Sequence, residues 1–220
     1  MHWLEQFFFI SIAFFAIVIV SPAGAEEDAI PLHGQFMFGK MSLDKESEHV
    51  EGGVYDLPLV GLVVQKQVNK GGFELGVETG AFFSIRGETR VVSVSGGSGG
   101  GSVNVTYDNK MLLFDYFGGV YIGARLAKRL RLYAGCGPLI IYGHREIEPE
   151  PYGPPETETE TDAGLSVGLY GRTGIEFIFT DRVIVGAGVR GMTSGLNLQS
   201  TIGSTRVEGL QYLLSLSFRF

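Results

Sequence analysis

The chain has 220 residues, of which 33 are glycine and one is cysteine. Its formal net charge at pH 7 is -7, so the composition offers no basic surface for nucleic acid. The single cysteine, Cys136, excludes an intramolecular disulfide, and hydrogen bonds and packing must hold the fold. Glycine is about twice as frequent as its usual share of roughly 7%, without the three-residue period of collagen.

Residues 1–25 are predicted to be a cleaved secretory signal peptide. A mostly apolar run from Phe7 to Val20 is followed by small residues at Ala23 and Ala25. This run is shorter than the roughly 20 residues that a transmembrane helix needs. We expect residues 26–32 to form a short lead before the mature domain, residues 33–220. Removal of the signal leaves 17 basic and 23 acidic residues, a net charge of -6.

From residue 33 onward, apolar residues recur with a period of two, and we find no convincing 3.6-residue period. Within 164–179, for example, Leu165, Val167 and Leu169 share one face, and Arg172 and Glu176 share the other. The pattern predicts an all-β chain of eight strands. In chain order they lie near 33–42, 55–68, 72–86, 111–126, 129–145, 164–179, 182–192 and 211–220.

The connections between these strands alternate in length. Short turns are predicted at 69–71, 127–128 and 180–181. Long polar segments separate the other strand pairs, near 43–54, 87–106, 148–161 and 199–206. Such alternation is typical of transmembrane barrels, which have short periplasmic turns and longer extracellular loops.

The polar face decides what surrounds the barrel, because alternation alone also fits a soluble sandwich or a lipocalin-like barrel. This face is rich in glycine, with a few spaced Arg, Glu and Tyr, as expected of a narrow, filled interior. Eight strands leave an interior just wide enough for side chains. The glycines predicted to face inward are Gly76, Gly80, Gly119, Gly123, Gly135, Gly137, Gly168, Gly174, Gly186 and Gly188.

Charged residues of both signs share the inward face, and buried charges need partners. A strand shifted by one residue would turn its arginine toward hydrocarbon, at about 2 to 4 kcal/mol near the bilayer midplane. We therefore expect an interior ion-pair network. Its predicted members are Glu74, Glu78, Arg86, Asp115, Arg125, Arg131, Arg172, Glu176 and Arg190.

Outward aromatic residues are predicted to form two girdles, one at each membrane interface. The girdle beside the short turns and the last residues comprises Phe73, Phe177, Phe179, Phe218 and Phe220. The girdle toward the long loops comprises Phe83, Phe114, Tyr116 and Tyr142.

The last strand alternates and finishes on the aromatic Phe220. It must close the barrel against the first strand, because unpaired backbone groups in hydrocarbon are costly. In these features the sequence resembles the small outer-membrane β-barrel family of the OmpA, OmpX and OmpW type, over nearly all of residues 33–220. The resemblance implies that the outward row of the last strand is read by the barrel assembly machinery. This row is Tyr212, Leu214, Leu216, Phe218 and Phe220.

Two loops and one histidine are the remaining candidates for a site. Residues 90–106 are predicted to extend two strands into a protruding hairpin with a glycine-serine tip. Residues 146–162 are rich in Glu and Pro, without the spacing of a calcium loop. His144 and Glu146 lie near the height at which lipid A deacylase-type barrels hold their catalytic residues, but the partner Ser is not identifiable. An acid/base pair of Glu78 and Glu176 is less favoured than structural pairing with arginine.

We therefore expect a monomeric barrel of the bacterial outer membrane, in contact with lipid and lipopolysaccharide. No enzymatic activity, cofactor, metal or nucleic-acid partner is expected. Its role would be structural, or would lie in surface interactions through the extracellular loops. Two alternatives stay open: a narrow OmpW-like channel for small solutes, and a lipid A-modifying enzyme.

Overall fold

The structure is a computed structural model that describes residues 32–46, 55–69, 73–95, 102–149, 159–200 and 203–220. The predicted signal peptide and residues 26–31 of the lead lie outside the described residues. None of the described residues belongs to a helix able to span a membrane. They form β1 (Leu32–Glu46), β2 (Tyr55–Gln67), β3 (Phe73–Ser95), β4 (Ser102–Ala127), β5 (Leu130–Pro149), β6 (Glu160–Ile178), β7 (Val183–Ser194), β8 (Asn197–Ser200) and β9 (Gly203–Arg219).

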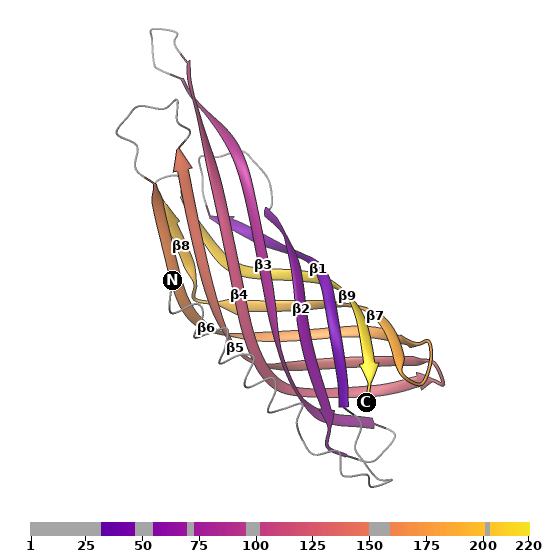
Figure 1. The fold of residues 1–220 in the computed structure, drawn as a ribbon. Coiled ribbons are helices and arrows are strands. Elements are labelled where there is room, and N and C mark those ends of the chain that lie inside the picture. Colours follow the sequence, from indigo (N-terminus) through magenta and orange to yellow (C-terminus); the bar gives the residue numbers. More distant parts are fainter. Residues whose placement is uncertain (1–31, 47–54, 70–72, 96–101, 150–158, 201–202) are drawn as a thin grey trace. The chain divides into compact units, whose positions relative to one another are not determined.

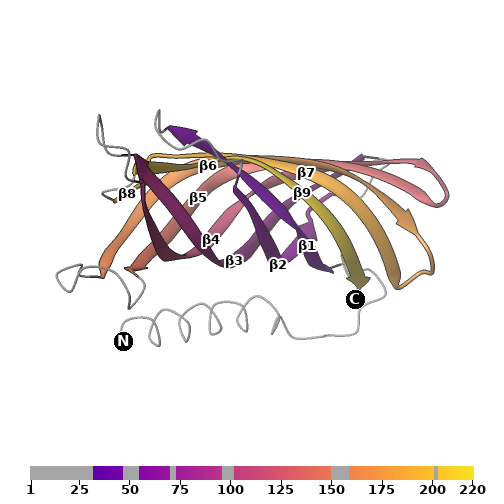
Figure 2. The same cartoon turned by 90° about the horizontal axis from the view of Figure 1, so that it is seen from above.

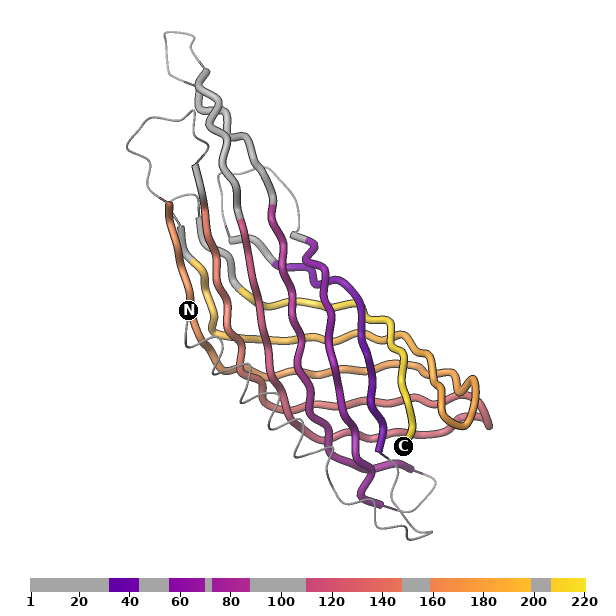
Figure 3. Tube along the Cα trace, viewed as in Figure 1, coloured from indigo at the N-terminus to yellow at the C-terminus, as the bar shows by residue number. Residues whose placement is uncertain are grey.

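The strands form one closed antiparallel sheet in which each long strand pairs with its neighbour in the chain (Figure 1, Figure 2). The last strand, β9, pairs with both β7 and β1, and the Cα trace shows β9 running beside β1 (Figure 3). The short strand β8 pairs with the beginning of β9. The predicted eight-stranded up-and-down barrel is confirmed, and β8 adds to one of its hairpins.

The register of the strand pairs sets how far they tilt. A walk around the barrel from Leu32 through successive partners returns to β1 at Ser42, ten residues further along (42 - 32). Such a stagger accompanies the tilt of about 35 to 45° that closed barrels require. The partners on this walk are Lys66, Val77, Val120, Cys136, Gly171, Gly191 and Leu210.

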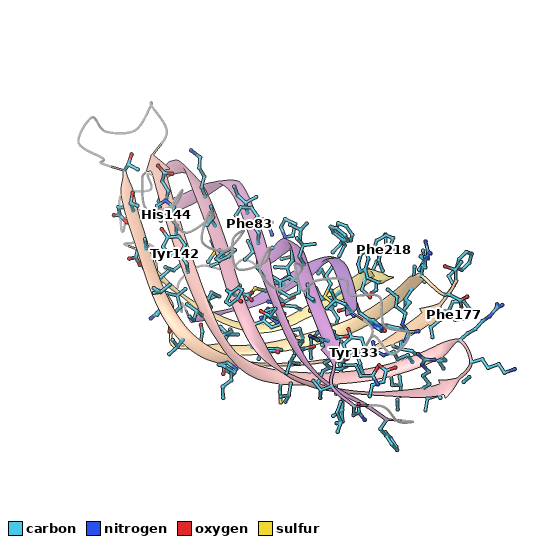
Figure 4. The ribbon with its side chains drawn as sticks, turned by 60° about the horizontal axis from the view of Figure 1, so that its bottom comes forward. Phe83, Tyr133, Tyr142, His144, Phe177 and Phe218 are labelled. Atoms are coloured by element: carbon cyan, nitrogen blue, oxygen red, sulfur yellow. The ribbon has the colours of Figure 1, made fainter. Side chains whose placement is uncertain are left out.

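Side chains alternate between the two faces as the sequence predicts. On β3, Phe73 and Val77 are exposed on the outside, whereas Glu74 and Glu78 are buried inside. Among the outward aromatic residues, Phe83 lies toward the long loops and Phe177 toward the short turns (Figure 4). The apolar residues therefore cover the outer wall, as expected of a barrel surrounded by lipid.

The hairpin that links β7 to β9 differs from the prediction of a long polar loop at 199–206. After Met192, which pairs with Gly209, the strand register shifts, and pairing resumes between Asn197 and Arg206. Four residues on one side, 193–196, face two on the other, 207–208, so the chain bulges inward. Gly209 has φ +143°, and a Cβ there would collide with the backbone oxygen of Ser42, so only glycine fits.

This bulge places apolar side chains in the lumen. The backbone N–H of Val207 donates to the oxygen of Leu196 at 2.9 Å, and Ser194 Oγ donates to the oxygen of Val207 at 2.6 Å. Leu196, Leu198 and Val207 are all buried. The hairpin therefore fills the long-loop end of the barrel interior.

Inward glycines let large side chains from other strands cross the narrow lumen. The hydroxyl of Tyr170 lies 2.6 Å from the Cβ position of Gly119, and that of Tyr133 lies 2.6 Å from the Cβ position of Gly174. Any larger residue at these glycines would occupy the space of the tyrosine. The close packing of the interior accounts for much of the glycine excess.

Gly119→Ala is expected to lower the free energy of unfolding by about 1 to 3 kcal/mol through overpacking. Its new Cβ would collide with the backbone oxygen of Cys136. The matched control is Gly171→Ala on the outer wall, where no heavy atom lies within 4 Å of the Cβ position. Its effect should stay within about 0.5 kcal/mol. Urea unfolding in micelles, followed by circular dichroism, measures both, and equal losses would contradict this packing.

Candidate functional site in the barrel lumen

The lumen contains two layers of different chemistry. The layer nearer the short turns holds buried carboxylates, guanidinium groups, glutamines and tyrosine hydroxyls. The layer nearer the long loops holds a continuous apolar cluster. The lumen therefore changes from polar to apolar between the short turns and the long loops.

Arg131 lies at the centre of the first ion cluster. Its Nε donates to Glu74 Oε2 at 2.8 Å, and its Nη1 donates to Glu176 Oε2 at 2.5 Å. Gln35 Nε2 donates to the other oxygen of Glu176 at 2.8 Å. Arg125 is half exposed, and its Nε lies 3.5 Å from Glu74 Oε1. One buried arginine thus holds carboxylates from two different strands.

The second cluster is built around Glu78. Arg172 Nη2 donates to Glu78 Oε2 at 2.6 Å, and Arg172 Nε donates to Oε1 at 3.0 Å. Gln65 Nε2 and the Tyr170 hydroxyl also donate to this carboxylate, at 2.8 and 2.9 Å. The Arg172 guanidinium also lies 5.0 Å from the centre of the Tyr133 ring. Because Glu78 accepts hydrogen bonds from three residues, its charge is well compensated.

The third pair, Arg190 and Asp115, forms the border with the apolar layer. Arg190 Nη2 donates to Asp115 Oδ1 at 2.7 Å, and Nη1 donates to Oδ2 at 3.0 Å, a bidentate pair. The guanidinium lies 4.7 Å from the centre of the Phe82 ring and 4.8 Å from that of Phe117. Arg190 is completely buried. A buried guanidinium thus lies inside the lumen against two aromatic rings that stack on each other, with their centres 5.8 Å apart.

Arg86 is the predicted network member that lies elsewhere. It is on β3, eight residues beyond Glu78 toward the long loops (86 - 78), and its Nη1 donates to the backbone oxygen of Asp56. The other predicted members occur in the three groups above. The side chain of Arg86 faces inward, like those of the network. Because Arg86 lies further along β3, however, it is at the long-loop rim of the barrel.

Sequence reasoning missed the apolar layer. It reads the inward face as glycine with spaced charges, whereas the upper lumen is lined by methionine, leucine and phenylalanine. Both parities are apolar there, as in Leu112-Leu113 and Ile140-Ile141, so the period of two is hidden. The sequence signal for this layer was a stretch of a predicted strand in which apolar and polar residues stop alternating. The buried methionines and leucines that meet in this layer include Met37, Met41, Leu57, Leu59, Met111, Leu113, Leu139 and Met192.

The candidate catalytic groups do not converge. His144 has the outward parity of β5 and lies beside Tyr142 at the long-loop end (Figure 4). Its register partners are Leu112 and Ala163, and neither can act as a nucleophile. Glu176 and Glu78 are each engaged by a different arginine. Residues 150–158 of the acidic loop lie outside the described residues. Within the described ranges, no cluster of His, Cys, Asp and Glu is placed to hold a metal ion.

Asp115→Asn is expected to lower the free energy of unfolding by about 3 to 5 kcal/mol, since it leaves a buried guanidinium uncompensated. The double variant Asp115→Leu/Arg190→Met should recover most of this loss, because Phe82 and Phe117 already surround the position. Asp56→Asn is the control, because Lys40–Asp56 is an exposed pair and its loss should barely move the midpoint. Urea titration reports all three, and an Asp115→Asn protein as stable as the native one would contradict the expectation.

No family model matches the sequence, and a search of curated proteins found no match. Among solved structures, the chain is similar to Ail, the attachment invasion locus protein of Yersinia pestis. The identity is 11%, the TM-score is 0.53, and the match covers 87% of this chain and 99% of that one. It is also similar to a major outer membrane protein of Thermus thermophilus, with 11% identity, a TM-score of 0.51 and coverage of 87% and 100%. The resemblance predicted from the sequence is confirmed at the level of the fold: the chain has the architecture of the small bacterial outer-membrane β-barrels.

Proposed function

We propose that the protein is a non-enzymatic, monomeric barrel of the outer membrane that acts through its extracellular hairpin, while its lumen stays filled. The observation that carries this proposal is the length of the hairpin formed by β3 and β4. Pairing between β2 and β3 reaches Ser84, but pairing between β3 and β4 continues to Ser95 and Ser102. On the other side, β4 pairs with β5 as far as Pro149. The hairpin therefore projects beyond its neighbours (Figure 1).

A projecting hairpin offers backbone groups for recognition. Along residues 85–95, the described neighbours give β3 a strand partner on its β4 side only. The opposite edge presents N–H and C=O groups that can pair with an added strand. Strand addition takes affinity from these backbone bonds and specificity from alternate side chains. An extended segment of a protein outside the cell is the kind of partner that fits.

The filled lumen supports the structural reading over the alternative of an OmpW-like channel. The Arg190–Asp115 pair and the rings of Phe82 and Phe117 cross the barrel at one level. Above them, Leu196 and Leu198 add a second apolar obstruction. A solute would have to displace a buried ion pair and an apolar cluster together.

The outward row of β9 is proposed to serve assembly as well as lipid contact. Tyr212, Leu214 and Phe220 are all at least half exposed on the outer wall. Because β9 pairs with β1, this strand also makes the seam that closes the barrel. The row is thus available to the barrel assembly machinery before closure and to lipid afterwards. The lipid A-modifying alternative has weaker support, because His144 faces outward beside Leu112 and Ala163.

Replacement of residues 88–109 by a tight turn is expected to abolish adhesion while the barrel still folds. Bacteria that display the full chain would be tested on surfaces coated with collagen, fibronectin or laminin, and on a lawn of the same strain. At least a tenfold loss of bound cells is expected on whichever surface binds. The matched control replaces residues 150–158 by Gly and Ser and should bind as the native chain does. Undiminished binding without the hairpin would contradict the proposal.

Single-channel recording in planar bilayers is expected to show no stable conductance steps for the native chain. A variant that shortens side chains of both obstructions, Asp115→Ala/Phe117→Ala/Arg190→Ala with Leu196→Ala/Leu198→Ala, should produce steps if it folds. Stable steps from the native chain would favour the OmpW-like channel instead.

A further inference from the structure

The short-turn mouth of the lumen holds polar atoms without partners. His33 is only 3% exposed, yet neither of its ring nitrogens forms a hydrogen bond with any described residue. The same holds for Arg219 Nε and for the hydroxyl oxygens of Ser217 and Ser215. Unpaired buried polar groups are costly, and natural proteins leave few of them. A cluster of four such side chains indicates that something else satisfies them.

These side chains lie together on two neighbouring strands. His33 of β1 pairs in register with Arg219 of β9, and Gln35 pairs with Ser217. Ser215 follows one step further inward, opposite Met37. All have the inward parity of their strands. The unpaired groups therefore form a short row that begins at the mouth and runs into the lumen.

Among the charged side chains that line the inside of this mouth, arginines outnumber carboxylates by one. The charges that act most strongly on Arg219 are those of Arg125, Glu74, Arg131 and Asp181. Glu74 is already shared by Arg131 and Arg125, and Glu176 is held by Arg131. Three arginines thus face two carboxylates inside the mouth (3 - 2 = 1), and Asp181 lies on the exposed turn outside. Deeper in the lumen, Arg172 and Arg190 each have a carboxylate of their own.

We propose that this mouth binds a phosphate group, held by the guanidinium of Arg219 with Arg125, the Ser217 hydroxyl and one ring N–H of His33. A guanidinium presents a planar fork of donors that matches phosphate oxygens. Neutral histidine and serine can each add one donor. The phosphate either is free in the periplasm or belongs to the headgroup of a phospholipid in the leaflet beside this mouth. The site does not depend on the hairpin and would stand if the hairpin bound nothing.

The first test is calorimetric titration of inorganic phosphate into the folded mature protein in dodecyl maltoside, an uncharged detergent without phosphate. Arg219→Gln is expected to weaken binding at least tenfold, and Ser217→Ala about threefold. The control is Arg129→Gln, which removes the same charge from an exposed turn at the same end and should change affinity less than twofold. Heat-dependent mobility on gels verifies that each variant is folded. If Arg219→Gln fails to fold, the proposal is tested by the Ser217→Ala protein, in which phosphate binding should still be weakened.

The second test separates the two sources of phosphate. The same titration is made in nanodiscs of phosphatidylglycerol and in nanodiscs of a galactolipid that lacks phosphate. Binding of free phosphate in both kinds of disc identifies a periplasmic anion as the ligand. If free phosphate binds in galactolipid nanodiscs and in detergent, but not in phosphatidylglycerol nanodiscs, the ligand is the lipid headgroup. In that case the phosphate of phosphatidylglycerol already occupies the site. No binding in detergent or galactolipid, or equal losses in Arg219→Gln and Arg129→Gln, overturns the proposal.

Discussion

The pairing of β9 with β1 is the constraint on which the rest of the structure depends. Every backbone N–H and C=O in hydrocarbon must find a partner within the protein, so a sheet in a membrane has to close on itself. The closing register runs from His33–Arg219 to Glu46–Ser204, with one shift beyond Leu43. With eight strands and a stagger of ten residues, closure also sets a narrow lumen. The side chains that fill this lumen then follow from the space that remains.

A narrow lumen explains why the interior combines glycine with large side chains. Where a large side chain points across the narrow lumen, a glycine on another strand can leave the space that it needs. Tyr170 above Gly119 and Tyr133 above Gly174 are examples. The same tyrosines border the ion clusters, since Tyr170 donates to Glu78 and the Tyr133 ring lies near Arg172. The two tyrosines therefore both fill the lumen and contact its buried charges.

The two layers of the lumen have opposite consequences for solvent and solutes. The polar layer near the short turns has a half-exposed arginine, Arg125, at its rim. The apolar layer offers no partner for a charged solute, and the inward bulge of Leu196 and Val207 thickens it. The Arg190–Asp115 pair lies between them.

Local sequence was sufficient for the strands, their faces and the alternation of turn lengths, because side-chain direction in a strand follows from a period of two. Glu74 and Glu78 face inward, and Phe73 and Val77 outward, for this reason alone. Which charges meet could be decided only by the closed barrel, since partners such as Glu78 and Arg172 are 94 residues apart. The alternation of side chains correctly predicts that Arg86 faces the lumen. Its position along the barrel axis depends on strand register and stagger, and these place it at the long-loop rim, away from the other members. The bulge at Gly209 and the apolar layer likewise depend on contacts across the barrel, which no single strand contains.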